Sequence, residues 1–240
     1  MGWASNIFGT INEVEIVRAL CHQVGAWLLL DAVHYAPHLP IDVQAVGCDF
    51  LLCSAYKFYG PHVGILYSKP GLLDRLQPDR LRTTDQQAPY SIETGTLNHA
   101  ALAGVSAAVD FIATLGEGNE KREKILDAMA LISAHEKKLA KMLYDGLLRI
   151  KGVNVYGPRV AKKLRAPTLA FTVKNMRADD VCKALAEQNI CAWSGHFYAI
   201  RATEVLGLYE KGGVTRMGIS LYNVEEDVER TLEVVRQLVG

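Results

Sequence analysis

The sequence lacks the features that mark membrane-spanning and secreted proteins. None of its apolar runs approaches the roughly 20 residues that a membrane-spanning helix needs, and its first residues do not follow the pattern of a signal peptide. The five cysteines are odd in number and include no CxxC pair. A disulfide framework and a structural zinc site are therefore not expected. These absences favour a cytoplasmic protein in a reducing compartment.

The chain also lacks an excess of either charge. Its 240 residues carry 26 Lys and Arg against 26 Asp and Glu, which argues against nucleic acid or an anionic membrane as the main partner. No GxGxxG motif follows a predicted strand, so a nicotinamide-binding domain is disfavoured. We find neither an internal repeat nor a low-complexity tract. Half of the residues are apolar, which predicts a packed core in one large or two modest domains.

The first half of the chain alternates apolar strands with helical spacing. Asn12 is a candidate N-cap for a helix that stops at Gly25. Further elements are expected as a strand at 26–30, a short helix at 43–46, and strands at 50–54 and 63–67. This order predicts a largely parallel α/β sheet with helices on both faces. Residues 78–92 show no periodicity and predict a polar loop.

The second half predicts two long helices and a smaller domain. Thr96 or Asn98 is expected to cap a helix at 99–115, and a charged helix at about 120–150 follows. Strands are then expected at 153–156, 168–173, 191–195 and 214–220, with helices at 179–188, 199–206 and 225–238. We therefore predict a large α/β domain at 1–115, a bridging helix at 116–150, and a small α+β domain at 151–240 whose sheet is covered on one face.

Lys57 lies in a turn between two apolar strands. By position alone it is a lysine that ends a strand and reaches solvent along its aliphatic stem. A desolvated lysine can instead act as a nucleophilic amine toward aldehydes. Asp31, His34 and Ser54 add a carboxylate, an imidazole and a hydroxyl near the ends of neighbouring predicted strands. Pyridoxal phosphate chemistry needs such a set, with the lysine forming a Schiff base and an aspartate holding the pyridine nitrogen protonated.

At these residues the sequence resembles the class V aminotransferases, and within them the cysteine desulfurase group. The matching segments follow the family's order: Ser5-Asn6 with Gly9-Thr10, Asp31 to His34, Pro40 to Val43, Cys48 to Phe50, Ser54 to Pro61, Glu93 to Asn98, Trp193 to His196, and Thr215 to Ser220. The resemblance implies the pyridoxal 5'-phosphate-dependent fold type I, with this chain corresponding to its carboxyl-terminal portion. A large domain that is only partly present would then be followed by a small α+β domain.

The resemblance also implies roles for single residues in cofactor binding. Lys57 resembles the Schiff-base lysine and Asp31 the partner of the pyridine nitrogen. His34 stands where relatives have a glutamine beside the cofactor's phenolic oxygen. Ser54 and Tyr56 resemble phosphate ligands. Thr96 resembles the residue that reaches the phosphate of the other subunit's cofactor, which implies a homodimer with shared active sites.

Three further residues are implied in substrate binding, namely Asn6, His196 and Arg216. Asn6 and Arg216 resemble the pair that holds the α-carboxylate of the substrate, with Arg216 acting as a bidentate fork. His34 and His196 also have an alternative interpretation as hydrogen-bonded core histidines. Arg216 has one as a surface arginine on a strand.

The sequence departs from the desulfurase pattern at two places. Tyr198 stands at or near the catalytic cysteine, and tyrosine cannot form a persulfide. The family's large domain also begins well before Ser5-Asn6, which suggests a missing N-terminal portion. We expect an enzyme that acts on a small amino acid by transamination, elimination or racemisation. The alternative is an incomplete or inactive chain that serves as a binding or assembly partner.

Overall fold

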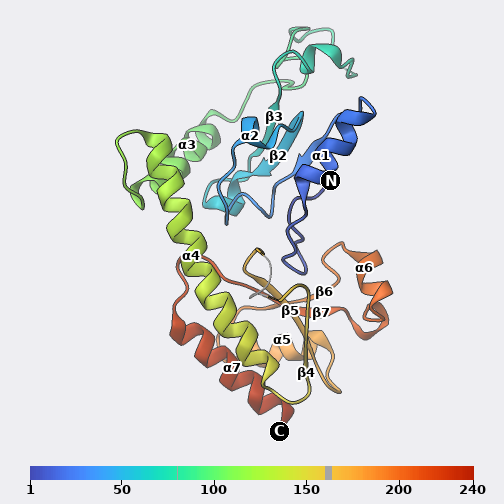
Figure 1. Cartoon of the computed structure of the whole chain (residues 1–240), viewed down its shortest axis with the longest axis vertical. Helices are drawn as coiled ribbons and strands as arrows, with labels where there is room; N and C mark the ends of the chain where they lie inside the picture. The colour runs from blue at the N-terminus through green and yellow to red at the C-terminus, as the bar shows by residue number, and fades with distance from the viewer. Residues whose placement is uncertain (80, 160–163) are drawn as a thin grey trace. The chain divides into compact units, whose positions relative to one another are not determined.

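The computed structural model describes residues 1–79, 81–159 and 164–240 (Figure 1). The chain divides into two compact units. The first contains Met1–Trp3 and Asn12–Met129, and the second contains Ala4–Ile11 and Ala130–Gly240. The boundary falls inside the long helix α4 (Lys121–Leu148). The short segment Ala4–Ile11 therefore belongs to the second unit, although the rest of that unit begins only at Ala130.

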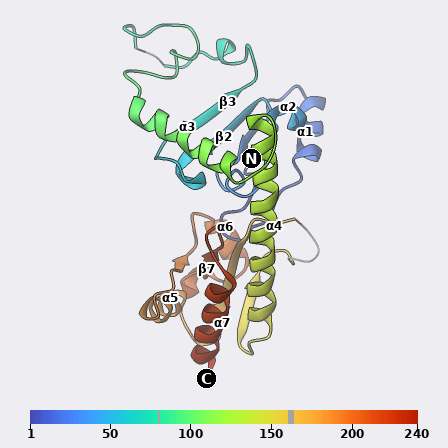
Figure 2. The same ribbon diagram turned by 90° about the vertical axis from the view of Figure 1, so that its left-hand side faces the viewer.

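The first unit is built around a three-stranded sheet in the order β1-β2-β3. Its elements are α1 (Val14–Gln23), β1 (Leu29–Asp31), α2 (Val43–Val46), β2 (Phe50–Ser54), η1 (Ala55–Phe58), β3 (Gly64–Ser68), η2 (Leu73–Arg75) and α3 (His99–Thr114). Helices α1 and α3 lie on opposite sides of the strands (Figures 1 and 2). This layering agrees with the predicted α/β class.

Strand direction matches the prediction for one of the two strand pairs. Strands β1 and β2 are parallel, as expected, with Leu29 opposite Phe50. Strands β2 and β3 are antiparallel, so the expectation of a parallel neighbour here was wrong. Residues 55–63 connect them, and that connection is too short for a parallel crossover, which needs about a dozen residues or more.

Only one of the two predicted helix caps forms in the first unit. Asn98 caps α3, because its Oδ1 accepts a hydrogen bond from the backbone N–H of Ala101 at 3.0 Å. Asn12 does not cap α1; its amide instead donates to the carbonyl of Gly2 at 2.7 Å, and Glu13 takes the N-cap position, where its side chain makes no capping hydrogen bond to the helix.

The second unit contains a four-stranded antiparallel sheet in the order β4-β5-β7-β6. Its elements are β4 (Val153–Tyr156), β5 (Thr168–Val173), α5 (Ala178–Glu187), β6 (Trp193–Gly195), α6 (Ile200–Val205), η3 (Tyr209–Lys211), β7 (Val214–Gly218) and α7 (Glu225–Val239). Leu169 and Phe171 of β5 pack into a large core with α4, α5 and α7. This core covers one face of the sheet, as predicted.

The opposite face of this sheet is covered as well, which the prediction of a single covered face missed. Ala170, between Leu169 and Phe171, points to this face and packs with Ile7, Leu208 and Val214. Ile7 comes from the segment Ala4–Ile11, so that segment forms part of the second unit's core. Sequence patterning could not reveal this, because the segment and the sheet are far apart in the chain.

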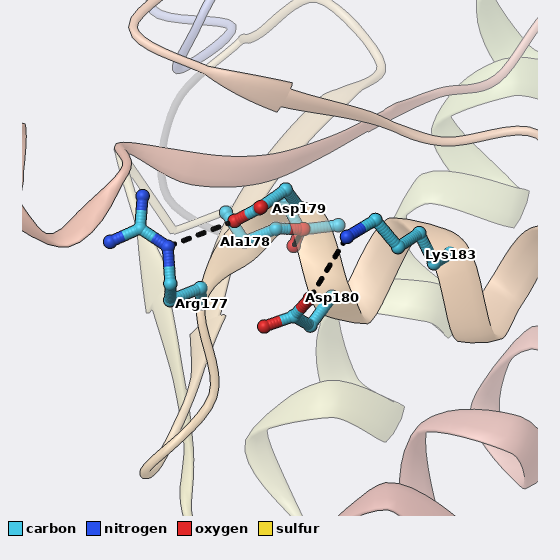
Figure 3. A network of polar contacts seen from close by, with 6 residues as sticks. Arg177, Ala178, Asp179, Asp180 and Lys183 are labelled. Atoms are coloured by element: carbon cyan, nitrogen blue, oxygen red, sulfur yellow. Dashed lines mark hydrogen bonds and ion pairs between the residues drawn. The ribbon is translucent and has the colours of Figure 1, made fainter.

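Exposed ion pairs decorate the surface of the second unit. At the start of α5, Arg177 Nε lies 3.2 Å from Asp179 Oδ1 and Lys183 Nζ lies 3.2 Å from Asp180 Oδ1 (Figure 3). Such exposed pairs contribute little to stability. Among the described residues, no helix combines the length and the apolar character that crossing a membrane requires.

Candidate functional site

Two neighbouring strands of the first unit end at the same edge of its sheet. Asp31 is the last residue of β1 and lies opposite Leu52 of β2, and Ser54 ends β2. The backbone N–H of Ala32 continues the ladder by donating to the carbonyl of Leu52 at 2.8 Å. Because carboxyl ends of parallel strands meet at one edge, Asp31 and the turn after Ser54 share that edge.

The turn that carries Lys57 is held by small and apolar anchors. Ala55 and Phe58 are buried, while Tyr56 between them is exposed. Tyr59 closes the turn in the left-handed conformation with φ 69°, and the N–H of Gly60 donates to the carbonyl of Ala55 at 2.9 Å. Beside these buried anchors, Tyr56 is exposed and Lys57 is half-buried.

Asp31 and Lys57 are the two charged side chains of interest at this sheet edge. Within the residues that the structure describes, neither of them forms an ion pair. Oδ1 of Asp31 accepts the backbone N–H of Val33 at 2.9 Å. Lys57 is half-buried, and its Nζ lies 5.2 Å from the centroid of the Tyr56 ring. A carboxylate and an ammonium therefore sit at one sheet edge without neutralising each other.

Some of the other predicted cofactor ligands lie at the same edge of the sheet, and Thr96 lies in a different segment. His34 is half-buried, and its ring centroid lies 5.5 Å from that of His38. Ser54 is half-buried at the end of β2. The ring of Tyr56 stacks on His62 with centroids 4.7 Å apart. Thr96 is exposed in the segment that precedes α3.

The second unit brings the predicted substrate-binding pair together. Arg216 of β7 lies opposite Ala170 of β5 and Trp193 of β6, on the face that packs against the segment Ala4–Ile11. Its Nη1 donates to the backbone carbonyl of Asn6 at 2.8 Å. The Asn6 side-chain amide donates to the carbonyl of Phe197 at 2.9 Å. Arg216 and Asn6 are thus linked directly.

Phe197 is a contact residue that the sequence analysis did not identify. Its ring centroid lies 4.0 Å from Cζ of Arg216, so the guanidinium is stacked on an aromatic face. Arg216 is half-buried, and burial lowers the pKa of its guanidinium. The aromatic residue directly after His196 was the available signal, but its meaning depends on the conformation of the loop.

That loop has an unusual backbone. Phe197 and Tyr198 both adopt left-handed conformations, with φ 52° and 62°. His196 Nδ1 accepts the N–H of Tyr198 at 3.1 Å, and the N–H of Ala199 donates to the carbonyl of His196 at 2.8 Å. Two successive bulky residues in this region are strained. The Tyr198 side chain is 95% exposed, so the loop projects a phenol into solvent.

Comparisons with known proteins agree on one family. The aminotransferase class-V family profile matches residues 1–231. A cysteine desulfurase of Yersinia pestis (strain Pestoides F) is 31% identical over 252 residues, covering 98% of this chain and 57% of the relative. The chain thus spans little more than half the length of the curated relatives that it matches.

Solved structures give the same result. The apo cysteine desulfurase from Thermococcus onnurineus NA1 superposes with a TM-score of 0.86 at 28% identity, over 99% of this chain and 58% of that one. The Escherichia coli cysteine desulfurase CsdA, in its S-sulfonic acid form, superposes with a TM-score of 0.84 at 27% identity, over 98% of this chain and 57% of that one. The chain therefore has the fold of these proteins.

Proposed function

Because the chain belongs to the class V aminotransferase family, we propose that it functions as a pyridoxal 5'-phosphate-dependent enzyme that acts on a small amino acid. The first unit would hold the cofactor and the second would hold the α-carboxylate of the substrate. The observation that carries this proposal is the carboxylate of Asp31 and the amine of Lys57 at one sheet edge, neither of them in an ion pair among the residues that the structure describes.

The residues at this edge fit the cofactor. The cofactor requires one amine that condenses with its aldehyde and one carboxylate that keeps its ring nitrogen protonated. Lys57 and Asp31 supply these groups, and neither is committed to an ion pair within the described ranges. Hydroxyls of Ser54 and Tyr56 are available to a phosphate, since Ser54 is half-buried and Tyr56 is exposed.

Each residue then has a defined task. When bound, pyridoxal phosphate supplies an electron sink for negative charge at the substrate Cα. With the cofactor bound, Asp31 would hold the proton on the ring nitrogen, and an N–H of His34 would donate to the phenolic oxygen. The amine of Lys57 would be the base that removes or returns the proton at the substrate Cα.

The second unit supports recognition of the substrate carboxylate. The guanidinium of Arg216 is stacked on Phe197 and hydrogen-bonded to the Asn6 carbonyl, which limits its motion. An ordered guanidinium binds a carboxylate with less loss of conformational entropy than a free one. We assign Asn6 and Arg216 to the α-carboxylate and His196 to the neighbouring part of the substrate.

The loop chemistry favours a reaction other than persulfide transfer. Tyr198, at or near the position of the desulfurases' catalytic cysteine, presents an exposed phenol instead of a thiol. Burial raises the pKa values of the Cys53 and Cys182 thiols, which weakens them as nucleophiles. We propose transamination, elimination or racemisation. Replacing Cys53, Cys182 and Cys191 together should leave any release of sulfide from cysteine unchanged; a loss would show that one of these thiols relays sulfur.

The first unit exposes apolar surface that a further part of the family fold would cover. Leu29 is 41% exposed, Leu52 36% and Leu66 41%, and the strand register puts all three on one sheet face. Exposed apolar area of this kind indicates an interaction surface. We propose that the active form contains a further portion of the fold, corresponding to the predicted N-terminal portion, and that it is a cytoplasmic homodimer in which Thr96 reaches the partner's cofactor phosphate.

A second exposed apolar surface of the first unit favours the alternative candidate, an incomplete or catalytically inactive chain that serves as a binding or assembly partner. Ile16, Leu20 and Val24 recur every four positions along and just beyond α1 and are also exposed. An apolar stripe at this spacing is a surface on which another helix can pack. Cofactor binding separates the two candidates, because an assembly role does not need it.

Titration with pyridoxal phosphate tests the proposal. The wild-type chain should develop the visible absorption band of a lysine-bound cofactor, and Lys57→Ala should not. Lys124→Ala is the matched control, since Lys124 is exposed in the same unit and should leave the band intact. A band that persists in Lys57→Ala would refute the assignment of the lysine. The absence of a band in all three chains would favour the assembly partner.

A further inference from the structure

Arg165 is a buried arginine for which the sequence offered no role. Its side chain is 9% exposed, and the guanidinium lies 6.0 Å from the centroid of the Tyr144 ring. Within the described ranges its N–H groups go to backbone carbonyls rather than to carboxylates. Nη1 donates to Pro158 at 2.5 Å, and Nη2 donates to Phe8 at 2.8 Å and also to Thr168.

The hydrogen bond from Arg165 to the carbonyl of Phe8 ties the segment Ala4–Ile11 to the rest of the second unit. Beside the Phe8 contact, the N–H of Ala166 donates to the carbonyl of Gly9 at 2.9 Å, and Thr10 forms a β-bridge with Arg165. Gly9 has φ +67°, and a Cβ there would lie 2.6 Å from the carbonyl oxygen of Ala166. The segment and the residues around Arg165 are therefore in close contact.

The same segment positions the proposed carboxylate-binding group. The carbonyl of Asn6 accepts a hydrogen bond from Arg216, and the Asn6 amide donates to Phe197, on which the Arg216 guanidinium stacks. Asn6 is two residues from Phe8, which Arg165 holds. A displacement of the segment would move the partner of Arg216 and the support of Phe197 together.

We propose that Arg165 is a positioning residue that sets the segment Ala4–Ile11 and, through Asn6, the orientation of Arg216 for the substrate carboxylate. The effect of Arg165 on substrate binding rests on the function proposed above, whereas its effect on the position of the segment Ala4–Ile11 does not. A planar guanidinium can serve three carbonyls in fixed directions, but a lysine ammonium acts as a single point donor on a flexible stem. Burial lowers the pKa of this guanidinium, in keeping with its enclosed position.

Hydrogen exchange of the full chain without ligand tests the first step. In Arg165→Met, amides of residues 4–11 should exchange at least about tenfold faster, as expected when a hydrogen bond to a charged group is lost. Arg165→Lys should give an intermediate acceleration. Arg177→Met is the control, because its exposed pair with Asp179 lies outside these contacts, and it should leave the segment unchanged.

Two results would overturn the positioning role. One is unchanged exchange of residues 4–11 in Arg165→Met. The other is equal acceleration over the whole second unit, α7 included, which would show that Arg165 only stabilises the unit. Arg165→Lys guards against misfolding of the methionine variant, because it keeps the positive charge and most of the side-chain volume.

Ligand binding tests the second step. With pyridoxal phosphate present, Arg165→Lys should weaken the apparent affinity for L-alanine about tenfold, as for the loss of one oriented contact with a charged group. Affinity for ethylamine, which lacks the carboxylate, should stay unchanged. Equal weakening for both ligands would refute a role through Arg216. If wild type shows no response to L-alanine, the proposed function fails, while the exchange experiment still decides the effect of Arg165 on the segment.

Discussion

Replacing Gly9 by alanine should be one of the most destabilising small substitutions in the second unit. Gly9 has φ +67°, and an added Cβ would lie 2.6 Å from the carbonyl oxygen of Ala166 and 2.8 Å from that of Thr168. Real Cβ atoms do not approach oxygen so closely, and both oxygens belong to backbone. The segment Ala4–Ile11 would therefore have to move away from β5.

The magnitude has two parts. A left-handed conformation costs a non-glycine residue about 1–2 kcal/mol. Overpacking against a fixed backbone adds about 1–3 kcal/mol. Gly207→Ala is a matched control, because Gly207 lies in the same unit with φ +65° and nothing within 4 Å of its added Cβ. It isolates the conformational part, so Gly9→Ala should exceed it by about 1–3 kcal/mol.

Urea unfolding followed by far-UV circular dichroism measures both variants. The midpoint should fall further for Gly9→Ala than for Gly207→Ala, with similar slopes if the unfolded states expose similar surface. Equal shifts in the two variants would refute the reasoning, since they would mean that the segment is not packed against Ala166 and Thr168.

Three further predictions concern single side chains. Arg216→Ala should weaken amino-acid binding about 10–100-fold by removing a charged carboxylate partner, whereas Arg201→Ala, whose side chain is 86% exposed, should not; equal affinities of the two variants would contradict this role. Asn98→Ala should destabilise α3 by about 1 kcal/mol in thermal melts, and Asn98→Asp, which keeps the capping oxygen, should not. The hydrogen bond from Asn223 holds the pKa of Asp227 below its usual value. The ionised Asp227 carboxylate therefore stabilises the folded state fully above the unfolded pKa of about 3.9, and this contribution is lost as the pH falls through the lower pKa of the folded state. In Asp227→Asn the free energy of unfolding should therefore depend less on pH over that acidic range. The same pH dependence in the variant and the wild type would contradict this contribution of Asp227.

Local signals in the sequence predicted much of the fold. The bounds of β2, β4 and β5 match the predicted strands at both ends. These strands are short, mostly apolar or alternating segments, and their identity depends on neighbouring residues in the chain. Asn98 was a correct cap candidate because its oxygen acts on a backbone N–H three residues away.

Long-range contacts account for what the sequence could not reveal. Nothing in residues 4–11 indicates that this segment packs on a sheet that begins at Val153. The link from Arg165 to Phe8 spans 157 positions. The antiparallel direction of β3 is a local property, because the connection of residues 55–63 is visible in the sequence and is too short for a parallel crossover.

A single measurement tests both the binding of the family's cofactor and its attachment to Lys57. The chain is incubated with pyridoxal phosphate, reduced with sodium borohydride, digested and mapped by mass spectrometry. A lysine bonded to the cofactor is then recovered as a stable phosphopyridoxyl derivative. The account predicts this label on Lys57, in the turn after β2. A label on a different lysine, or no label on any, would contradict it.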